Sequence, residues 1–123
     1  MLDKRNFYID GKWTKPSKPN DFGVINPSNE ETFATISLGT KEDTDTAVKA
    51  AKSAFNSWKE TSKTERIDYL EKLLKNYKKR FNEMAEAMSM EMGAPIDYAI
   101  STHTASGQSH IEDFILRLKE FKF

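Results

Sequence analysis

Residues 39–58 read GTKEDTDTAVKAAKSAFNSW and mark the point where the chain changes from one kind of secondary structure to another. Thr40 is a helix-capping residue type, and Asp43 follows at the position from which a carboxylate reaches back to the exposed amides. Behind them the apolar residues recur at helical spacing, and many are alanines: Ala47, Val48, Ala51, Ala54, Phe55 and Trp58. The stretch therefore predicts an amphipathic helix that packs closely against another backbone.

A β-hairpin is predicted well before this helix. Asp10-Gly11 separates two short runs, Phe7–Ile9 and Lys12–Thr14, that are rich in aromatic and β-branched residues. Asp-Gly is a strong hairpin signal because glycine accepts the positive φ of a tight type I′ turn.

Two further short strands are predicted between the hairpin and the helix, over residues 22–26 and 32–38. Asn26-Pro27 opens the turn between them. The apolar alternation of the second strand slips at Ala34-Thr35, so a bulge is expected there.

Helical patterns continue through residue 120. Ser62 and Glu65 have the spacing of a capping box, and apolar residues follow them at helical intervals. We expect a break near Asn82, because asparagine can restart a helix as an N-cap. Gly93 followed by Pro95 predicts a left-handed helix stop and then a new helix with proline in its first turn.

The composition limits the classes of function. A chain of 123 residues is one domain at most, and its 31% of charged residues exceeds the usual share of about 25%. The 19 basic and 19 acidic residues balance, so nothing attracts nucleic acid in bulk, and the basic run Lys78–Arg80 is interpreted as a solvated helix face. The absence of cysteine excludes disulfides, thiolate zinc sites and cysteine nucleophiles. With neither a signal peptide nor an apolar run of about 18 residues, a cytoplasmic protein without membrane contact is expected.

No catalytic constellation emerges from the residues themselves. His103 and His110 are seven apart, whereas a two-histidine metal site on a helix has i, i+4 spacing. Asp97 and Glu112 are interpreted as exposed helix carboxylates, because nothing places them together as an acid–base pair. The five glycines are scattered, so no phosphate-binding loop is predicted.

Four segments, taken in order, resemble one protein family. They are FYIDGKW (7–13), VINPSNEETFATISLGTKEDTDTAVKAAKSAFNSW (24–58), SKTERIDYLEKL (62–73) and MEMGAP (90–95). Together they are similar to the N-terminal part of the NAD(P)-dependent aldehyde dehydrogenases, and the resemblance covers essentially the whole chain.

The resemblance implies an α/β family of which this chain is an α+β fragment. Residues 1–39 would supply short strands and residues 40–120 three to four helices, all from the outer part of a Rossmann-like NAD(P)-binding domain. The family oxidises an aldehyde to a carboxylic acid through a cysteine thiohemiacetal, with NAD or NADP as cofactor. Its nucleophile, glutamate base and cofactor loop lie downstream, so residues 1–123 would lack the catalytic domain, any cofactor of their own and any activity alone.

One binding feature of the family is transferred by resemblance. Some members hold a monovalent cation with backbone carbonyls just before the Asn-Pro turn and with an acidic side chain before the Gly-x-Pro stop. Those positions are Val24, Ile25 and Glu91 here. Glu91 stands where aspartate is more usual and the last ligand lies downstream, so an ordinary carboxylate at a helix end is the alternative.

Two interpretations of the whole chain remain open. The first is a truncated aldehyde dehydrogenase: a split gene, a frameshifted copy, a cloned segment or an early stop. Its partners would be a complementary C-terminal chain or homologous subunits, and Phe121-Lys122-Phe123 would be the first residues of a strand that lacks its sheet. The second is a stand-alone helical module that binds an intact homologue through an exposed stripe of Ala47, Ala51, Phe55 and Trp58.

Overall fold

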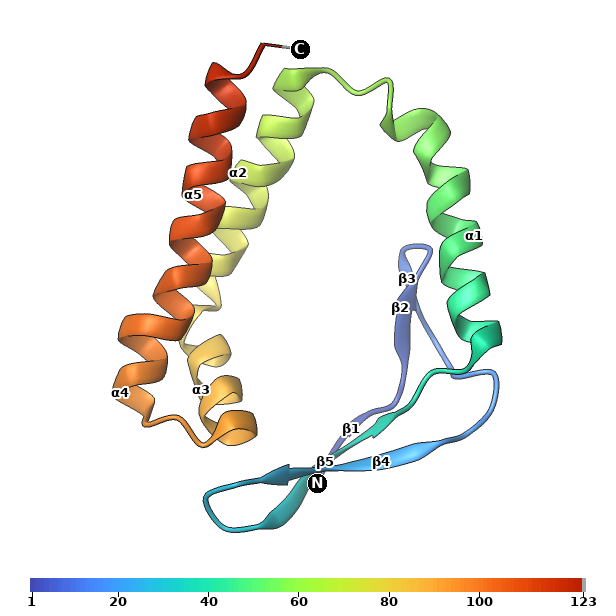
Figure 1. Ribbon diagram of the computed structural model, residues 1–123, viewed down its shortest axis with the longest axis vertical. Coiled ribbons are helices and arrows are strands. Elements are labelled where there is room, and N and C mark those ends of the chain that lie inside the picture. The colour runs from blue at the N-terminus through green and yellow to red at the C-terminus, as the bar shows by residue number, and fades with distance from the viewer. Residues whose placement is uncertain (123) are drawn as a thin grey trace. The chain divides into compact units, whose positions relative to one another are not determined.

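The computed structural model describes residues 1–122, in which five short strands precede a series of helices (Figure 1). The chain divides into two compact units, the first being Met1–Glu60 and the second beginning at Thr61. This arrangement is α+β, as expected from the sequence. Phe123, the last residue of the predicted terminal strand, lies outside the described residues. Phe121 has extended backbone angles, and neither it nor Lys122 lies in a strand.

The first unit contains two small sheets and one helix. Its elements are β1 (Leu2–Lys4), β2 (Phe7–Ile9), β3 (Lys12–Thr14), β4 (Asp21–Asn26), β5 (Glu31–Ser37) and α1 (Lys41–Trp58). β5 is the central strand of a three-stranded sheet in the order β1-β5-β4, pairing in parallel with β1 and antiparallel with β4. The sequence did not predict β1, because its three residues are too few to show an alternation of apolar and polar side chains.

The predicted hairpin is confirmed. β2 and β3 pair antiparallel, and the turn residues Asp10 and Gly11 have φ angles of 54° and 75°, as a type I′ turn requires. Tyr8 lies opposite Trp13, and their rings meet edge to face with centroids 5.3 Å apart. This cross-strand aromatic pair stabilises a hairpin too short to stand alone.

The bulge in β5 lies one residue earlier than expected. Val24 pairs with Ala34, whereas its neighbour Ile25 pairs with Thr32, so Phe33 is the extra residue. We expected the slip at Ala34-Thr35, where the apolar alternation breaks. The position of a bulge depends on how the strand pairs with its neighbour and not on its own side-chain alternation. The apolar pattern of β5 alone does not contain the pairing with β4.

The second unit is helical. It contains α2 (Lys63–Lys79), α3 (Phe81–Met92), the single turn α4 (Ile96–Tyr98), the π-helix η1 (Ala99–Thr104) and α5 (Ala105–Glu120). Its most buried side chains are Ala85 of α3, Ala99 and Thr104 of η1, and Ile115 of α5. Small residues therefore form the core where α3 packs on η1, which lets the two backbones approach closely.

The predicted helix break near Asn82 is confirmed, and it lies at Arg80. Arg80 ends α2 and begins α3 with φ −108° and ψ 19°, and no side chain caps the new helix. Asn82 is inside α3, so the expected asparagine cap is wrong. The Gly93 stop is confirmed, with φ 69° and ψ 16°. Pro95 is the N-cap residue of α4 and not a residue of its first turn.

α2 and α5 are tied together at both ends. Lys119 pairs with Glu71 at 2.9 Å and Lys78 with Glu112 at 2.8 Å. The Lys63 ammonium donates to the carbonyls of Lys119 and Phe121 at 3.0 and 3.1 Å, where α5 ends with carbonyls that have no helical partner. These contacts orient the helix pair.

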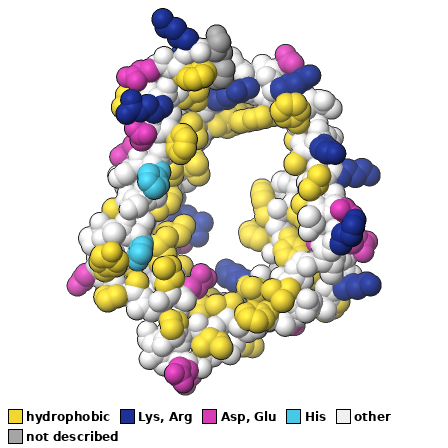
Figure 2. All heavy atoms as spheres, in the orientation of Figure 1, with side chains coloured by type: hydrophobic (Ala, Val, Ile, Leu, Met, Phe, Trp, Pro, Cys, Tyr) yellow, Lys and Arg dark blue, Asp and Glu magenta, His cyan; other side chains and the backbone are white. Residues whose placement is uncertain are grey.

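Many large apolar side chains are open to solvent in both units (Figure 2). Trp13 is 71% exposed, Phe55 of α1 59% and Phe114 of α5 68%. Scattered exposed apolar residues are normal on a protein surface, but their number here exceeds the handful that are fully buried.

Candidate functional site

Val24 and Ile25, the first two residues of the predicted cation site, lie side by side on β4 at the bulge. Val24 is partly buried and Ile25 is 54% exposed. Glu91 is exposed in the last turn of α3, two residues before the left-handed Gly93, and it belongs to the other unit. The assignment of this set to a monovalent cation stays a prediction. No group of three or more histidine, aspartate or glutamate side chains within residues 1–122 has the geometry of a metal site.

The other polar residues considered from the sequence have structural contacts. Glu112 accepts hydrogen bonds from the Lys78 ammonium at 2.8 Å and from the Gln108 amide at 3.1 Å, and the lysine lowers its pKa. His103 lies in η1, where its ring meets the ring of Tyr98 edge to face at 5.0 Å. Asp97 is exposed. Glu112 thus orients helices and remains ionised, which does not suit a general acid.

The N-termini of α1 and α2 are occupied by carboxylates of the chain itself. Asp43 accepts hydrogen bonds from the Thr40 amide and hydroxyl at 2.8 and 2.9 Å and from the Ser17 amide at 2.8 Å. Glu65 accepts from the Ser62 amide and hydroxyl, both at 2.8 Å. These hydrogen bonds, led by those from the Thr40 and Ser62 amides, lower the pKa of each carboxyl. Both predicted capping boxes are confirmed, and neither helix start offers its amides to a phosphate.

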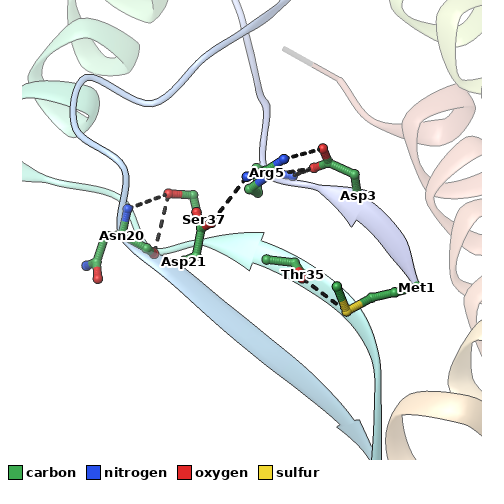
Figure 3. Close-up of polar contacts among 7 residues, drawn as sticks. All are labelled: Met1, Asp3, Arg5, Asn20, Asp21, Thr35 and Ser37. Carbon is green, nitrogen blue, oxygen red and sulfur yellow. Dashed lines mark hydrogen bonds and ion pairs between the residues drawn. The ribbon is translucent and has the colours of Figure 1, made fainter.

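A cluster around Arg5 was missed by sequence reasoning. The Arg5 guanidinium lies between Asp3 of β1 and Asp21 of β4, donating to Asp3 at 2.7 and 2.9 Å and to Asp21 at 3.2 Å (Figure 3). Hydrogen bonds from Arg5 lower the pKa of Asp3 to about 2, and the two aspartates raise the pKa of Arg5. The cluster borders a shallow groove lined by Lys15, Pro16 and Pro19.

The Arg5 cluster joins the two outer strands of the sheet across β5. In the same region the Ser37 hydroxyl donates to the Asn20 carbonyl at 3.4 Å, and the Thr35 hydroxyl donates to the Met1 sulfur at 3.6 Å (Figure 3). All three kinds of guanidinium nitrogen are engaged by carboxylates, so the charge of Arg5 is compensated and the cluster links the two strands. The Asp-x-Arg spacing in β1 is a sequence signal for the first pair, but Asp21 joins only through the fold.

A second groove lies where α2 breaks into α3. Leu73 and Tyr77 line it from α2, Met84 and Ala87 line it from α3, and its volume is about 340 Å³. Its polar rim is formed by Asn76 and by Arg80, whose Nε and Nη2 donate to one Glu83 oxygen at 3.0 and 2.8 Å. Its charged lining residues, Arg80 and Glu83, pair with each other, so the groove can bury an apolar group.

Comparison with known proteins places the chain among enzymes that are much longer. The family model described as the aldehyde dehydrogenase family matches residues 13–120. A 3-succinoylsemialdehyde-pyridine dehydrogenase from a Pseudomonas species is 39% identical over all of this chain, which covers 26% of that protein. A putative aldehyde dehydrogenase from Staphylococcus saprophyticus is 37% identical, with 97% of this chain and 26% of that protein covered.

Solved structures agree. An aldehyde dehydrogenase from Bartonella henselae superimposes with a TM-score of 0.99 and 55% identity over the whole of this chain and 26% of its own. Aldehyde dehydrogenase C from Pseudomonas syringae, a mutant solved with NAD+ and octanal, superimposes with a TM-score of 0.95 at 34% identity over 97% of this chain and 24% of its own. The chain thus spans about a quarter of the length of the relatives it matches.

Proposed function

Since this chain belongs to the aldehyde dehydrogenase family and corresponds to the N-terminal part of its members, we propose that it is a scaffolding segment of their NAD(P)-binding domain. In this proposal residues 1–39 supply the outer strands and residues 40–120 the outer helices. The residues that react with the aldehyde lie in the part of the family fold that this chain does not include.

One observation carries the proposal: the chain reproduces a quarter of an aldehyde dehydrogenase with a TM-score of 0.99 and yet has no cysteine. Oxidation through a thiohemiacetal needs a thiolate to attack the aldehyde carbon, because the aldehyde releases a hydride only after a nucleophile has added to that carbon. No other residue here replaces the thiolate. The carboxylates with lowered pKa are acceptors in helix caps and ion pairs, and Asp43 among them is buried.

The nicotinamide cofactor of the family does not fit the residues present. A dinucleotide pyrophosphate is held by a glycine-rich turn at a free helix N-terminus. The glycines here are scattered, and the N-termini of α1 and α2 already hold Asp43 and Glu65. We therefore assign no cofactor contact to this chain, although the P. syringae relative was solved with NAD+.

The purified chain tests the proposal directly. Residues 1–123 are mixed with NAD+ or NADP+ and with short and long aliphatic aldehydes, and formation of the reduced nicotinamide is followed at 340 nm. No rate above the protein-free blank is expected, while the B. henselae relative assayed in parallel should turn over. Sustained turnover by the 123-residue chain would refute the proposal.

The interaction-module alternative is supported by the exposure of part of its predicted stripe. Ala51, Phe55 and Trp58 of α1 are exposed, whereas Ala47 is partly buried beside the β2–β3 hairpin. Pulldown with an intact homologue separates the two functions. A compact monomer that melts cooperatively and captures the homologue favours the module, whereas aggregation of the chain alone favours the scaffold. That a complementary C-terminal chain is the partner, and that the protein is cytoplasmic, both stay predictions.

A further inference from the structure

A groove in the first unit is lined by the β2–β3 hairpin and by α1, which contacts β2 (Figure 1). Cross-strand partners share one face of a hairpin, so Ile9 and Lys12 lie on the face opposite the Tyr8–Trp13 pair. The groove has a volume of about 330 Å³, at the lower end of the range of small-molecule sites. Its α1 side is formed by residues at positions i, i+3, i+4 and i+7, which share one helix face: Thr46, Lys49, Ala50 and Ser53.

Basic groups outnumber acidic ones in this groove. Lys12 and Lys49 line it, and Asp10 is the single carboxylate among its lining residues, all of which the structure describes. Within residues 1–122 neither lysine ammonium forms an ion pair or a hydrogen bond, with Asp10 or with any other group. The groove beside the Arg5 cluster differs, because its guanidinium is already paired with two aspartates. The two ammonium groups are therefore available to an anion from solution.

One hydroxyl in the groove is also available as a donor. Thr14 and Thr46 donate their hydroxyl hydrogens to backbone carbonyls at 3.3 and 2.9 Å. The Ser53 hydroxyl makes no hydrogen bond to any group in the described part of the chain. It lies one helical turn beyond Lys49, so a hydroxyl and an ammonium group follow each other along one face of α1. Two ammonium groups and one hydroxyl are the kinds of donor that the oxygens of a phosphate accept.

We propose that this groove binds the phosphate group of a small, water-soluble phosphate monoester. Such a group carries a charge of about −1.5 to −2 at neutral pH, which two lysines match, whereas a carboxylate carries a single charge. Ile9 and Ala50 are half-buried in the same groove and give the rest of the ligand a short apolar surface. This binding goes beyond the scaffolding role proposed above and does not depend on it.

An NMR titration of the 123-residue chain tests the site. The ¹⁵N-labelled chain is titrated with phenyl phosphate and, separately, with inorganic phosphate, and the shifts of its backbone amides are followed. The groove variant carries Lys12→Gln with Lys49→Gln. The matched control carries Lys4→Gln with Lys52→Gln, which removes the same charge from a strand and from α1 at positions that do not line the groove.

We expect phenyl phosphate to shift the amides of the groove residues in a saturable way. The groove variant should bind it at least about fivefold more weakly, because it loses two charge-assisted contacts, and the control should stay within about twofold. Inorganic phosphate should shift the same amides with lower affinity, since it does not cover Ile9 and Ala50. Circular dichroism checks that each variant keeps its secondary structure.

Asp10→Asn is a second variant that acts in the opposite direction. Asparagine before glycine keeps the type I′ turn of the hairpin, and the change removes the negative charge that faces the ligand. Phenyl phosphate should therefore bind about twofold more tightly or better. Asp97→Asn, which removes an exposed carboxylate from the second unit, should leave the affinity unchanged.

Weakening that is confined to the groove variant, with tightening in Asp10→Asn, supports the proposal. Equal weakening in the groove variant and its control would overturn it, because binding would then follow net charge alone. The absence of saturable shifts at millimolar phenyl phosphate would also overturn it. So would binding to vesicles of phosphatidic acid in phosphatidylcholine without binding of phenyl phosphate, because the partner would then be a lipid surface.

Discussion

The hydroxyl of Tyr77 lies where a side chain at Gly107 would stand: a Cβ added at residue 107 would come within 2.3 Å of the tyrosine oxygen. That hydroxyl donates to the carbonyl of Thr104 at 3.0 Å, at the junction of η1 and α5. Thr104 is fully buried, so its carbonyl has little access to water. Gly107 therefore lets α2 satisfy a backbone group of the helix packed against it.

Gly107→Ala should destabilise the helical unit by about 1 kcal/mol, although alanine favours a helix over glycine by about the same amount. The reason is that the added methyl group displaces Tyr77, which overpacks the contact at a cost of about 1–3 kcal/mol and removes the hydrogen bond to the buried Thr104 carbonyl. Tyr77→Phe alone should cost about 1 kcal/mol. Urea unfolding followed by circular dichroism measures both. The double variant should lose less unfolding free energy than the two single variants lose when their losses are added. If the losses simply add, the two residues are not coupled.

Ser62→Ala should lower the free energy of unfolding of α2 by about 1 kcal/mol, because it removes the hydroxyl that accepts from the Glu65 amide at 3.2 Å. Thr64→Ala is the matched control. It removes an exposed hydroxyl from the first turn of the same helix and introduces a better helix former, so stability should stay level or rise slightly. Thermal melts monitored at 222 nm compare the two. Equal losses would show that the hydroxyl is not acting as a cap.

Arg5→Gln should raise the pKa of Asp3 from about 2 toward its ordinary value of 3.8. The arginine supplies the hydrogen bonds that favour the charged carboxylate, and glutamine supplies no charge. Carboxyl ¹³C chemical shifts followed against pH measure this pKa in the full chain. Arg117→Gln, which removes an arginine paired with Asp113 and Glu120 on its own helix, should leave the Asp3 titration unchanged. An Asp3 pKa that stays near 2 in the Arg5 variant would exclude this cause.

Stability should fall in acid because the pKa values of Asp3, Asp43 and Glu65 are all lowered in the folded chain. A group with a depressed folded pKa contributes stability above its unfolded pKa, and this contribution is lost as the pH falls through the folded value. The loss should begin near the ordinary glutamate value of 4.5 and continue to about 2, the folded value of Asp3.

Asp43→Asn provides the variant for this acid transition. It should be less stable than the unmodified chain at neutral pH and should lose less stability between neutral pH and acid, because asparagine does not take up a proton. Chemical unfolding at a series of pH values gives both quantities. An unchanged acid slope in the variant would show that Asp43 does not contribute to the transition.

The turns and helix caps of this chain could be predicted from its sequence, because the residues that form each of them are only a few positions apart. Asp10-Gly11 sets its own turn, Thr40 with Asp43 and Ser62 with Glu65 form their own caps, and Gly93 alone accepts the left-handed angles that end α3. The resemblance that identified the family depends on the same segments. The absence of cysteine, also a property of the sequence, excludes the family's nucleophile.

Contacts between distant residues were decided only by the tertiary structure. Nothing near Asp21 indicates that it completes the Arg5 cluster, and nothing near Gly107 indicates that Tyr77 occupies the space of its missing side chain. The bulge at Phe33 and the break at Arg80 also depend on what each segment packs against. The physical reason is range: turns and caps satisfy backbone groups a few residues away, whereas register, grooves and ion pairs between elements depend on partners that the fold brings together.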